Sequence, residues 1–227
     1  IGQNSNALET RVNKLSGVAN GTQGIYILEA DNITVDSVSA ISINRVNPNP
    51  TTTTIVTDTT RSDLETTGSN GAIVLQTTNG TITINDGNGD TVGVSANGSG
   101  NILLQAQGTN TDIILNTGVT SGSGNLSVIA PRNINLTDAT ADIKTTGGDI
   151  DLQASTGTID SVTGVEISSS NGDIRQQVAG TLTLNHLTNA GTGNINLIAG
   201  QGVLDDGDSD AIDIQGVNLL FSPGTNP

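Results

Sequence analysis

A short phrase recurs along the chain: glycine, then Asn or Asp in most copies, then aliphatic residues at every second position. It reads GNILLQA from Gly100, GNLSVIA from Gly124, GDIDLQA from Gly148, GDIRQQV from Gly172 and GNINLIA from Gly193. These starts lie 24, 24, 24 and 21 residues apart, and the looser copies GAIVLQT and QGVNLLF begin at Gly71 and near Gly216. Apolar residues with a period of two predict a strand with one buried face.

Aligning the copies predicts which side chains face inward. The alignment gives two columns of aliphatic residues and one column of small residues. The first holds Ile102, Leu126, Ile150, Ile174, Ile195 and Val217; the second holds Leu104, Val128, Leu152, Leu197 and Leu219, with Gln176 as an exception; the third holds Ala106, Ala130, Ala154, Val178 and Ala199. The residues between these positions are mostly polar, so we expect them to face water.

The position after each glycine is polar in every one of the five clear copies. It is occupied by Asn101, Asn125, Asp149, Asp173 and Asn194. Stacked Asn side chains bond to each other along a pile of strands, so we expect a hydrogen-bonded ladder here. Asp149 next to Asp173 brings two carboxylates together, which predicts either a raised pKa for one of them or a cation or arginine that bridges them. Asp151 next to Arg175 is expected to supply part of that compensation.

Two further short alternations lie between successive phrases, as at Ile134 and Leu136. One period of three strands cannot bury its inward face, but periods stacked ~4.8 Å apart bury a continuous column. The sequence therefore predicts an all-β fold, a single parallel β-helix (β-solenoid) with about 24 residues and three short strands per coil. Parallel crossovers favour a right-handed winding. A β-sandwich is the alternative, although it predicts hairpins rather than a fixed phase.

Two stretches interrupt the pattern and define the expected domain organisation. Residues 6–16 have apolar residues on one helical stripe and capping-box spacing, which predicts a short capping helix within an amino-terminal segment, 1–23. The solenoid is expected over 24–221. Its second coil is interrupted at 44–62, where two prolines and four consecutive threonines predict a loop insertion. A short tail, 222–227, follows.

Composition narrows the classes of partner. The chain has 227 residues with 7 basic against 22 acidic side chains, a net charge of −15, so nucleic acid is not an expected partner. No run approaches the ~18 apolar residues of a membrane span. Cys, Met and Trp are absent and only Tyr26 and Phe221 are aromatic, which excludes thiolate chemistry and suits thin aliphatic columns better than a globular core.

Two acidic turns have the alternation of the first ligands of a calcium loop. They are formed by Asp86, Asn88 and Asp90, and by Asp206, Asp208 and Asp210. The rest of the EF-hand pattern is missing, because neither turn has the glycine at position six or the glutamate at position twelve. Solvated corners of the solenoid and a calcium site of moderate affinity are both open interpretations. Calcium is the only cofactor that the sequence suggests.

Catalysis has little support. Asp149, Asp151 and Asp173 form the kind of acidic cluster that polysaccharide-degrading β-helices use, yet only Arg175 is basic nearby. The two aromatic residues leave almost nothing to stack against sugar rings. His186 is the only histidine, and nothing in the sequence places it beside a nucleophile. We therefore expect that the chain is not an enzyme.

The phrases GNINLIAGQG, GDIDLQASTG and GNLSVIAPRN resemble the repeats of filamentous-haemagglutinin-like exoproteins, which are large β-helical surface proteins of bacteria. The resemblance covers roughly residues 71–221. It implies a secreted adhesive or scaffold role without catalysis, an extracellular or cell-surface location, and glycans or host receptors as possible ligands.

The two ends of a β-helix carry unpaired strand edges that proteins cover or use. The last strand-like stretch, VNLLFSPGTNP, is apolar and has no evident cap. We therefore predict an extracellular structural protein, a subunit of a surface filament or matrix that joins other copies head to tail through the solenoid ends. A fragment of a larger secreted adhesin is the first alternative, and a polysaccharide-degrading β-helix enzyme is the second.

Overall fold

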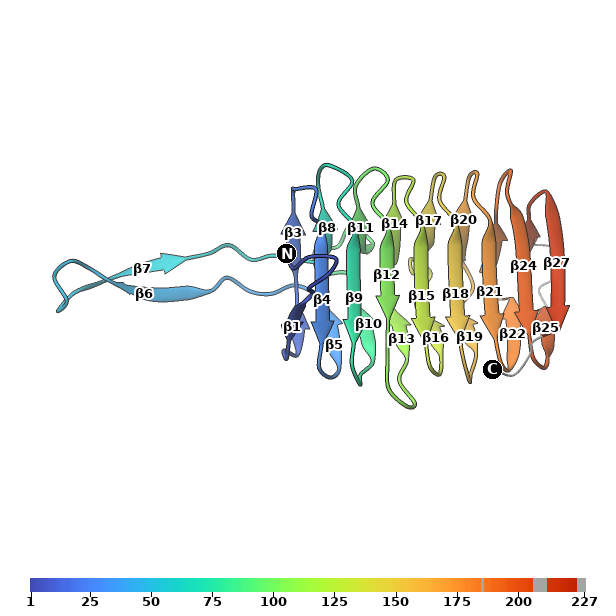
Figure 1. Ribbon diagram of the computed structural model, residues 1–227, viewed down its shortest axis with the longest axis horizontal. Helices are drawn as coiled ribbons and strands as arrows, with labels where there is room; N and C mark the ends of the chain where they lie inside the picture. Colours follow the sequence, from blue (N-terminus) through green and yellow to red (C-terminus); the bar gives the residue numbers. More distant parts are fainter. Residues whose placement is uncertain (185, 206–211, 224–227) are drawn as a thin grey trace.

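A computed structural model describes residues 1–184, 186–205 and 212–223. Within these residues the chain forms strands and no helix. The strands build three long sheets that run side by side along one axis, with each strand lying across that axis (Figure 1). None of the described segments is a helix with the length and apolarity to span a membrane.

The largest sheet has nine strands, all parallel to their neighbours. In spatial order they are β1 (Leu8–Thr10), β4 (Ile25–Glu29), β9 (Ile73–Thr77), β12 (Ile102–Gln105), β15 (Leu126–Ala130), β18 (Ile150–Ala154), β21 (Ile174–Val178), β24 (Asn194–Ala199) and β27 (Asn218–Pro223). Spatial order follows chain order, with strands of the other sheets between them in the sequence. The recurring phrases supply most of this sheet.

Two other parallel sheets complete the layers. The six-stranded sheet contains β2 (Lys14–Leu15), β5 (Ile33–Val35), β10 (Ile82–Ile84), β13 (Ile113–Leu115), β16 (Ile134–Leu136) and β19 (Ile159–Ser161). Next to β19 lie β22 (Thr181–Leu184) and its partner β25 (Gly202–Asp205). The eight-stranded sheet contains β3 (Gly17–Ala19), β8 (Leu64–Thr66), β11 (Val92–Ala96), β14 (Gly118–Ser121), β17 (Ile143–Thr145), β20 (Val165–Ser169), β23 (His186–Asn189) and β26 (Ile214–Gln215). This arrangement of long parallel sheets fits a β-solenoid.

The predicted columns form the part of the core that the nine-stranded sheet supplies, and apolar residues of the other two sheets complete it. Ile102 pairs with Leu126 and Leu126 with Ile150, and these side chains are at most 2% exposed. The alternate residues face outward, as the period of two predicted. Two assignments in the last phrase were wrong: Leu219, expected in the second column, lies opposite Ile195 in the place given to Val217, and Phe221 lies opposite Leu197 in the second column. The last phrase is aligned by Asn218, which pairs with Asn194, rather than by its glycine.

The predicted capping helix at 6–16 is wrong. This segment contains β1 and β2, which pair with β4 and β5. Leu8 and Leu15, expected on one helical stripe, lie opposite Ile27 and Val35 in two different sheets. An isolated helix of this length is marginal in water, whereas the edges of β4 and β5 offer backbone hydrogen bonds and apolar columns to extend.

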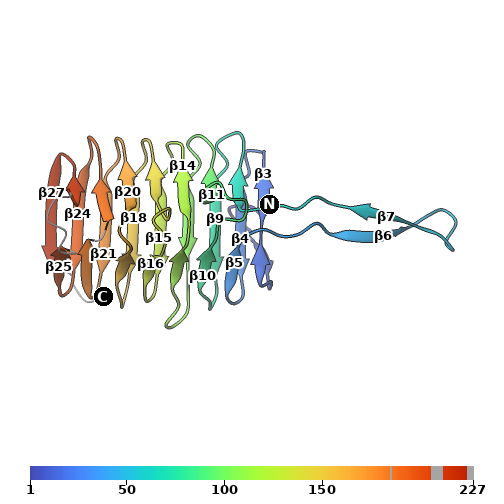
Figure 2. The ribbon, with the colours of Figure 1, turned by 180° about the vertical axis from the view of Figure 1, so that it is seen from behind.

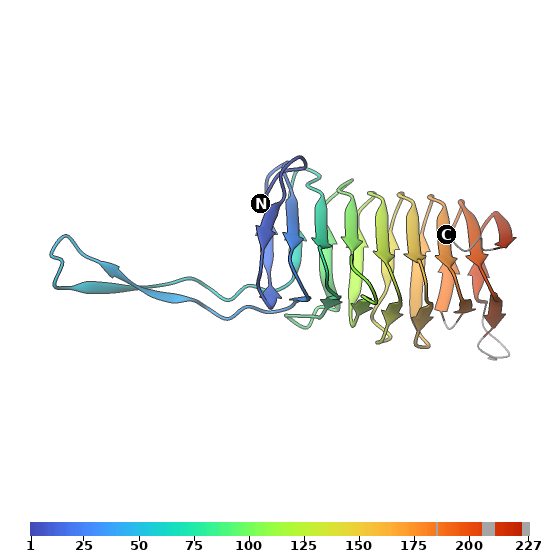
Figure 3. The same ribbon diagram turned by 60° about the horizontal axis from the view of Figure 1, so that its bottom comes forward.

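The stretch expected as a loop at 44–62 belongs to a β-hairpin. Strands β6 (Ser42–Val46) and β7 (Thr53–Thr57) pair antiparallel, with Ser42 opposite Thr57. The hairpin projects from the stack beside β1, along the long axis and away from the coils; Figures 1, 2 and 3 show it from three sides. Its base is closed where Val38 and Arg61 exchange backbone hydrogen bonds of 2.7 and 3.0 Å.

Candidate functional site

The predicted ladder at the start of the nine-stranded sheet is confirmed, with a different bonding pattern. Most of these side chains accept the backbone N–H at the same position of the next strand. Side-chain amides also donate at the end of the series, from Asn194 to Asp173 Oδ1 at 2.9 Å and from Asn218 to Asn194 Oδ1 at 2.7 Å. Asn101 Oδ1 accepts the Asn125 N–H at 2.8 Å, and Asp149 Oδ1 accepts the Asp173 N–H at 2.9 Å. The backbone N–H of Asp173 therefore offsets the negative charge of the neighbouring Asp149 carboxylate. The sequence did not suggest this donor. These bonds fix the height of one strand above another.

The three candidate acidic residues of this sheet line one shallow groove of about 640 Å³. Each carboxylate is engaged: Asp149 by the Asp173 N–H, Asp173 by the Asn194 N–H at 2.7 Å, and Asp151 by Arg175 Nη1 at 2.7 Å. The expected Asp151–Arg175 pair is thus present. The geometry brings the carboxylates together, but it uses them to join neighbouring strands.

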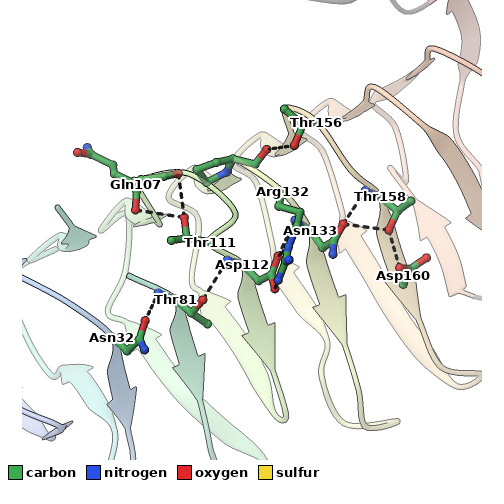
Figure 4. Close-up of polar contacts among 12 residues, drawn as sticks. Asn32, Thr81, Gln107, Thr111, Asp112, Arg132, Asn133, Thr156, Thr158 and Asp160 are labelled. Atoms are coloured by element: carbon green, nitrogen blue, oxygen red, sulfur yellow. Dashed lines mark hydrogen bonds and ion pairs between the residues drawn. The ribbon is translucent and has the colours of Figure 1, made fainter. Parts of the chain in front are cut away.

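A second ladder, which the sequence analysis missed, runs along the start of the six-stranded sheet (Figure 4). Asn32 Oδ1 accepts the Thr81 N–H at 2.8 Å, and Thr81 Oγ1 accepts the Asp112 N–H at 3.1 Å. Asp112 and Asn133 continue the series with bonds of 3.0 and 3.1 Å to the N–H groups of Asn133 and Thr158. The signal was available, since each of these residues precedes a buried isoleucine.

Arg132 reinforces the second ladder at its centre (Figure 4). Its Nε donates to Asp112 Oδ1 at 2.8 Å, and a second bond reaches Asp112 Oδ2. The bond from Arg132 holds the pKa of the Asp112 carboxyl below its ordinary value, with a further contribution from the Asn133 N–H, although burial opposes both. A bidentate pair of this kind is both strong and directional.

The acidic turn at 86–90 is occupied by its own backbone. Asp86 accepts the N–H groups of Gly89 at 2.6 Å and Thr91 at 2.8 Å, and Asp90 accepts the Val92 N–H at 2.9 Å. Burial raises the pKa of Asp86, but these donors outweigh it and the pKa lies below its ordinary value. Within the described residues, no three His, Cys, Asp or Glu side chains gather closely enough to hold a metal ion.

The other proposed calcium ligands, Asp206, Asp208 and Asp210, lie outside the described residues. Calcium at either turn stays a prediction of the sequence. The 86–90 turn has a structural role in any case, because its side chains hold the corner that leads into β11.

A polar hollow of about 370 Å³ adjoins this turn. Asp63 lies at its edge, 7% exposed and in the left-handed backbone region (φ 61°). Burial raises the pKa of its carboxyl, and three neighbouring carboxylates add to this, while the Gly87 N–H at 2.9 Å opposes it. The residue joins the base of the hairpin to the turn in the following coil.

Gln176 breaks an otherwise aliphatic column, as the sequence indicated. It is fully buried between Leu152 and Leu197. Its Nε2 donates to Thr188 Oγ1 at 2.7 Å, across the interior from the eight-stranded sheet, and its Oε1 has no partner among the described residues.

The second column is open at both ends of the stack. At one end Leu8 is 48% exposed, and at the other Phe221 is 56% exposed, whereas Leu75, Leu104 and Leu152 between them are fully buried. The edge of β1 and the edge of β27 have no partner strand among the described residues. Both ends therefore present an apolar column and a row of backbone groups.

No family model matches the chain, and no curated protein or solved structure matches it either. The resemblance to filamentous-haemagglutinin-like exoproteins accordingly stays an expectation from the repeat phrases.

Proposed function

We propose that the chain is a non-catalytic structural protein, a subunit of an extracellular filament or matrix in which copies join end to end. The observation that supports this most directly is the open apolar column, exposed at Leu8 on one end and at Phe221 on the other. A second copy placed end to end would continue the column and pair the free edges of β1 and β27.

The body of the molecule suits such a role. Polar side chains of the two ladders tie one strand to the next, so these interactions repeat along the axis from coil to coil. We take the fold to be a right-handed solenoid, because parallel crossovers are nearly always right-handed. The registers of Ile102 with Leu126 and Leu126 with Ile150 support about 24 residues per coil.

Sedimentation velocity and negative-stain electron microscopy test the proposal. The parent chain is expected to form species that grow with concentration, and thin rods one solenoid wide. Phe221→Asp is expected to suppress this growth, because a charge at the end of the column would be buried in the contact. Val162→Asp is the matched control, since Val162 is also an exposed apolar residue (39%) but lies on the body of the stack.

Two results would count against end-to-end assembly. One is a parent chain that remains monomeric over the whole concentration range. The other is an equal loss of assembly in the Phe221→Asp and Val162→Asp variants, which would indicate lateral contacts. A fragment of a larger adhesin predicts that further coils of the same polypeptide, rather than another copy, cover β27.

A polysaccharide-active enzyme is the second candidate, because one groove contains Asp149, Asp151 and Asp173. It is less favoured, since these carboxylates are held by N–H groups and by Arg175. Release of reducing ends from a panel of acidic polysaccharides, lost in the Asp149→Asn variant, would favour it.

A further inference from the structure

We propose that the β6–β7 hairpin is a dimerisation element that packs face to face against the same hairpin of a second copy of this chain. This contact is independent of the proposed end-to-end assembly, because it involves neither the edge of β1 nor that of β27. Between rows of copies, it would join two rows at the ends that carry β1. The contact surface is one face of the hairpin, here called the docking face. It consists of Ile41, Ile43, Arg45, Thr54, Val56 and Asp58.

The hairpin has no core of its own. Nine of its ten strand residues are exposed, and Val56 is partly covered. An isolated two-stranded hairpin is marginally stable in water. On the docking face, Ile41 is 59% and Ile43 is 57% exposed. A partner that covers this face would therefore bury apolar area and stabilise the hairpin as well.

The register of the hairpin brings the docking-face side chains together. Ile43 lies opposite Val56, and Arg45 follows Ile43 on the same face. The Asp58 N–H donates to the Ile41 carbonyl at 2.9 Å, so the antiparallel ladder continues for one pair beyond β6 and β7. Because side chains alternate along a strand, these residues share one side of the hairpin.

The opposite face is less suited to a specific contact. Val46 and Ile55 lie there, but each is paired with a polar residue, Thr53 and Asn44 respectively. Its strand residues include no charge that could orient a partner. The docking face has both an apolar centre and charges at its ends, so it is the face on which a partner can be positioned.

The charges make the docking face complementary to itself. Arg45 lies at the end toward the turn and Asp58 at the end toward the stack, with Ile43 and Val56 between them. About 13 Å of strand separates the two charges, and neither forms an ion pair within the described residues. In a dimer whose two-fold axis crosses the strands, each Arg45 lies at the end where the other copy has Asp58. Two ion pairs then flank one apolar centre.

The same orientation keeps the acidic bodies apart. Residues 38–61 carry a net charge of +1, from Arg45, Arg61 and Asp58, so the remainder of the chain carries −16. The hairpin projects along the stack axis beyond β1 (Figures 1 and 3), so antiparallel hairpins place the two bodies at opposite ends of the contact. Residues 38–46 span at most about 30 Å when extended, well beyond the ~8 Å over which charge acts. A two-fold axis along the strands would instead bring the bodies side by side and Arg45 onto its own counterpart.

The size of the docking face determines the expected strength. Six side chains per copy are far fewer than the ~20–30 residues per partner of a stable interface. We therefore expect a weak and reversible dimer, whose orientation is specified by the two ion pairs.

The absence of cysteine makes disulfide trapping a direct test. The two-fold axis brings Ile43 of one copy onto Ile43 of the other, so Ile43→Cys chains should form covalent dimers under mild oxidation. Asn44→Cys is the matched control, because its side chain lies on the opposite face of the same strand. Both chains also carry Phe221→Asp, so that end-to-end contacts do not contribute. On a non-reducing gel, we expect Ile43→Cys to cross-link several-fold faster than Asn44→Cys.

Charge reversal tests the two ion pairs. In the Phe221→Asp background, Arg45→Asp and Asp58→Arg should each weaken dimerisation by about tenfold in sedimentation equilibrium, because each brings like charges together at both ends. An equimolar mixture of these two variants should form heterodimers with close to the original affinity, since unlike charges then meet at both ends. Arg61→Asp is the control, because it changes the net charge as Arg45→Asp does but lies outside the docking face.

The outcomes separate the hairpin dimer from end-to-end assembly. A Phe221→Asp chain that is monomeric, or cross-linking by Asn44→Cys as fast as by Ile43→Cys, would overturn the hairpin dimer and leave end-to-end assembly standing. Equal weakening by Arg61→Asp and Arg45→Asp, without heterodimers in the mixture, would overturn the paired charges and with them the proposed orientation. A parent chain that stops at dimers, which charge reversal dissociates, would support the hairpin contact and overturn end-to-end assembly.

Discussion

Replacing Gly148 by alanine tests one of the closest backbone contacts among the described residues. An ideal Cβ at this position lies 2.0 Å from the carbonyl oxygen of Gly124, its counterpart in the preceding coil, whereas ordinary contacts of this kind begin at 3.4 Å. The same relation recurs between Gly172 and Gly148. The recurring glycine therefore serves close stacking of backbones, since the φ of Gly148 is not in the left-handed region.

The expected cost follows from this geometry. Relieving the overlap requires the two coils to separate by about 1.4 Å at this corner, because the contact is with backbone and not with a side chain that could rotate away. The adjoining bond from the Leu126 N–H to the Asp149 carbonyl, now 2.9 Å, would be lost. Overpacking of about 1–3 kcal/mol and one hydrogen bond of about 1 kcal/mol, less about 0.5 kcal/mol from the stiffer unfolded chain, give a net loss of about 1.5–3.5 kcal/mol.

Gly21→Ala is the matched control. A Cβ there meets nothing within 4 Å, and its φ is also outside the left-handed region. Its effect should stay within about 1 kcal/mol and tend to stabilise. Far-UV circular dichroism in urea and on heating is the suitable assay, because the chain has no Trp and a single Tyr for fluorescence. For a chain of this size, Gly148→Ala should lower the midpoint temperature by about 3–14 °C. Coincident transitions for the two variants would refute the close-stacking explanation.

The remaining predictions concern two buried polar groups. Thr188→Val should cost about 1–3 kcal/mol by removing the partner of the buried Gln176 amide, whereas the double variant with Gln176→Leu should be at least as stable as the parent in urea. Burial raises the pKa of Asp63, so its carboxyl favours the folded state below its ordinary pKa of 3.8, and this contribution is lost as the pH rises through the higher folded value. The asparagine of the Asp63→Asn variant does not ionise, so the free energy of unfolding of this variant should increase relative to that of the parent as the pH rises from 3 to 7. Urea titrations of both chains at each pH measure this difference.

The columns of the nine-stranded sheet could be predicted because the phrase combines two independent signals. A period of two identifies the buried face, and the glycine with its following Asn or Asp fixes the register from copy to copy. The wrong placement of Val217 shows which of these signals determines the register. The spacing of the aliphatic residues and Asn218 determines the pairing, since the glycine of this copy lies one residue out of phase.

The segment at 6–16 could not be assigned from local spacing. Leu8 and Leu15 satisfy a helical stripe, yet their partners, Ile27 and Val35, are distant in sequence. Glu29 also favours strands over a helix in this segment. Its fully buried carboxylate accepts hydrogen bonds from the Thr10 hydroxyl at 2.7 Å and from the Val12 N–H, and these bonds fix the turn between β1 and β2. A long-range contact of this kind leaves no mark in an eleven-residue window.

The hairpin was missed because its strands face solvent on both sides and so carry no periodic pattern of apolar residues. Without a buried face, β6 and β7 lack the alternation that identified the strands of the recurring phrases. The Thr-rich stretch and the turn with Pro48 and Pro50 therefore indicated only a break in the repeat. An exposed strand pair that is held at its base by Val38 and Arg61 is a feature that sequence periodicity cannot detect.

The net charge of −15 limits how copies can meet. Lateral contacts between two such bodies bring many carboxylates within the ~8 Å over which charge acts at physiological salt. The cations cannot relieve this, since five of them already join neighbouring coils, as Arg132 does with Asp112 and Lys144 with Glu166. Contacts that bring few carboxylates close to each other are therefore favoured. The open columns at Leu8 and Phe221 and the hairpin, whose only charged strand residue is Arg45, are the surfaces that meet this condition. The proposed end-to-end association would therefore bring fewer carboxylates together than a lateral contact would.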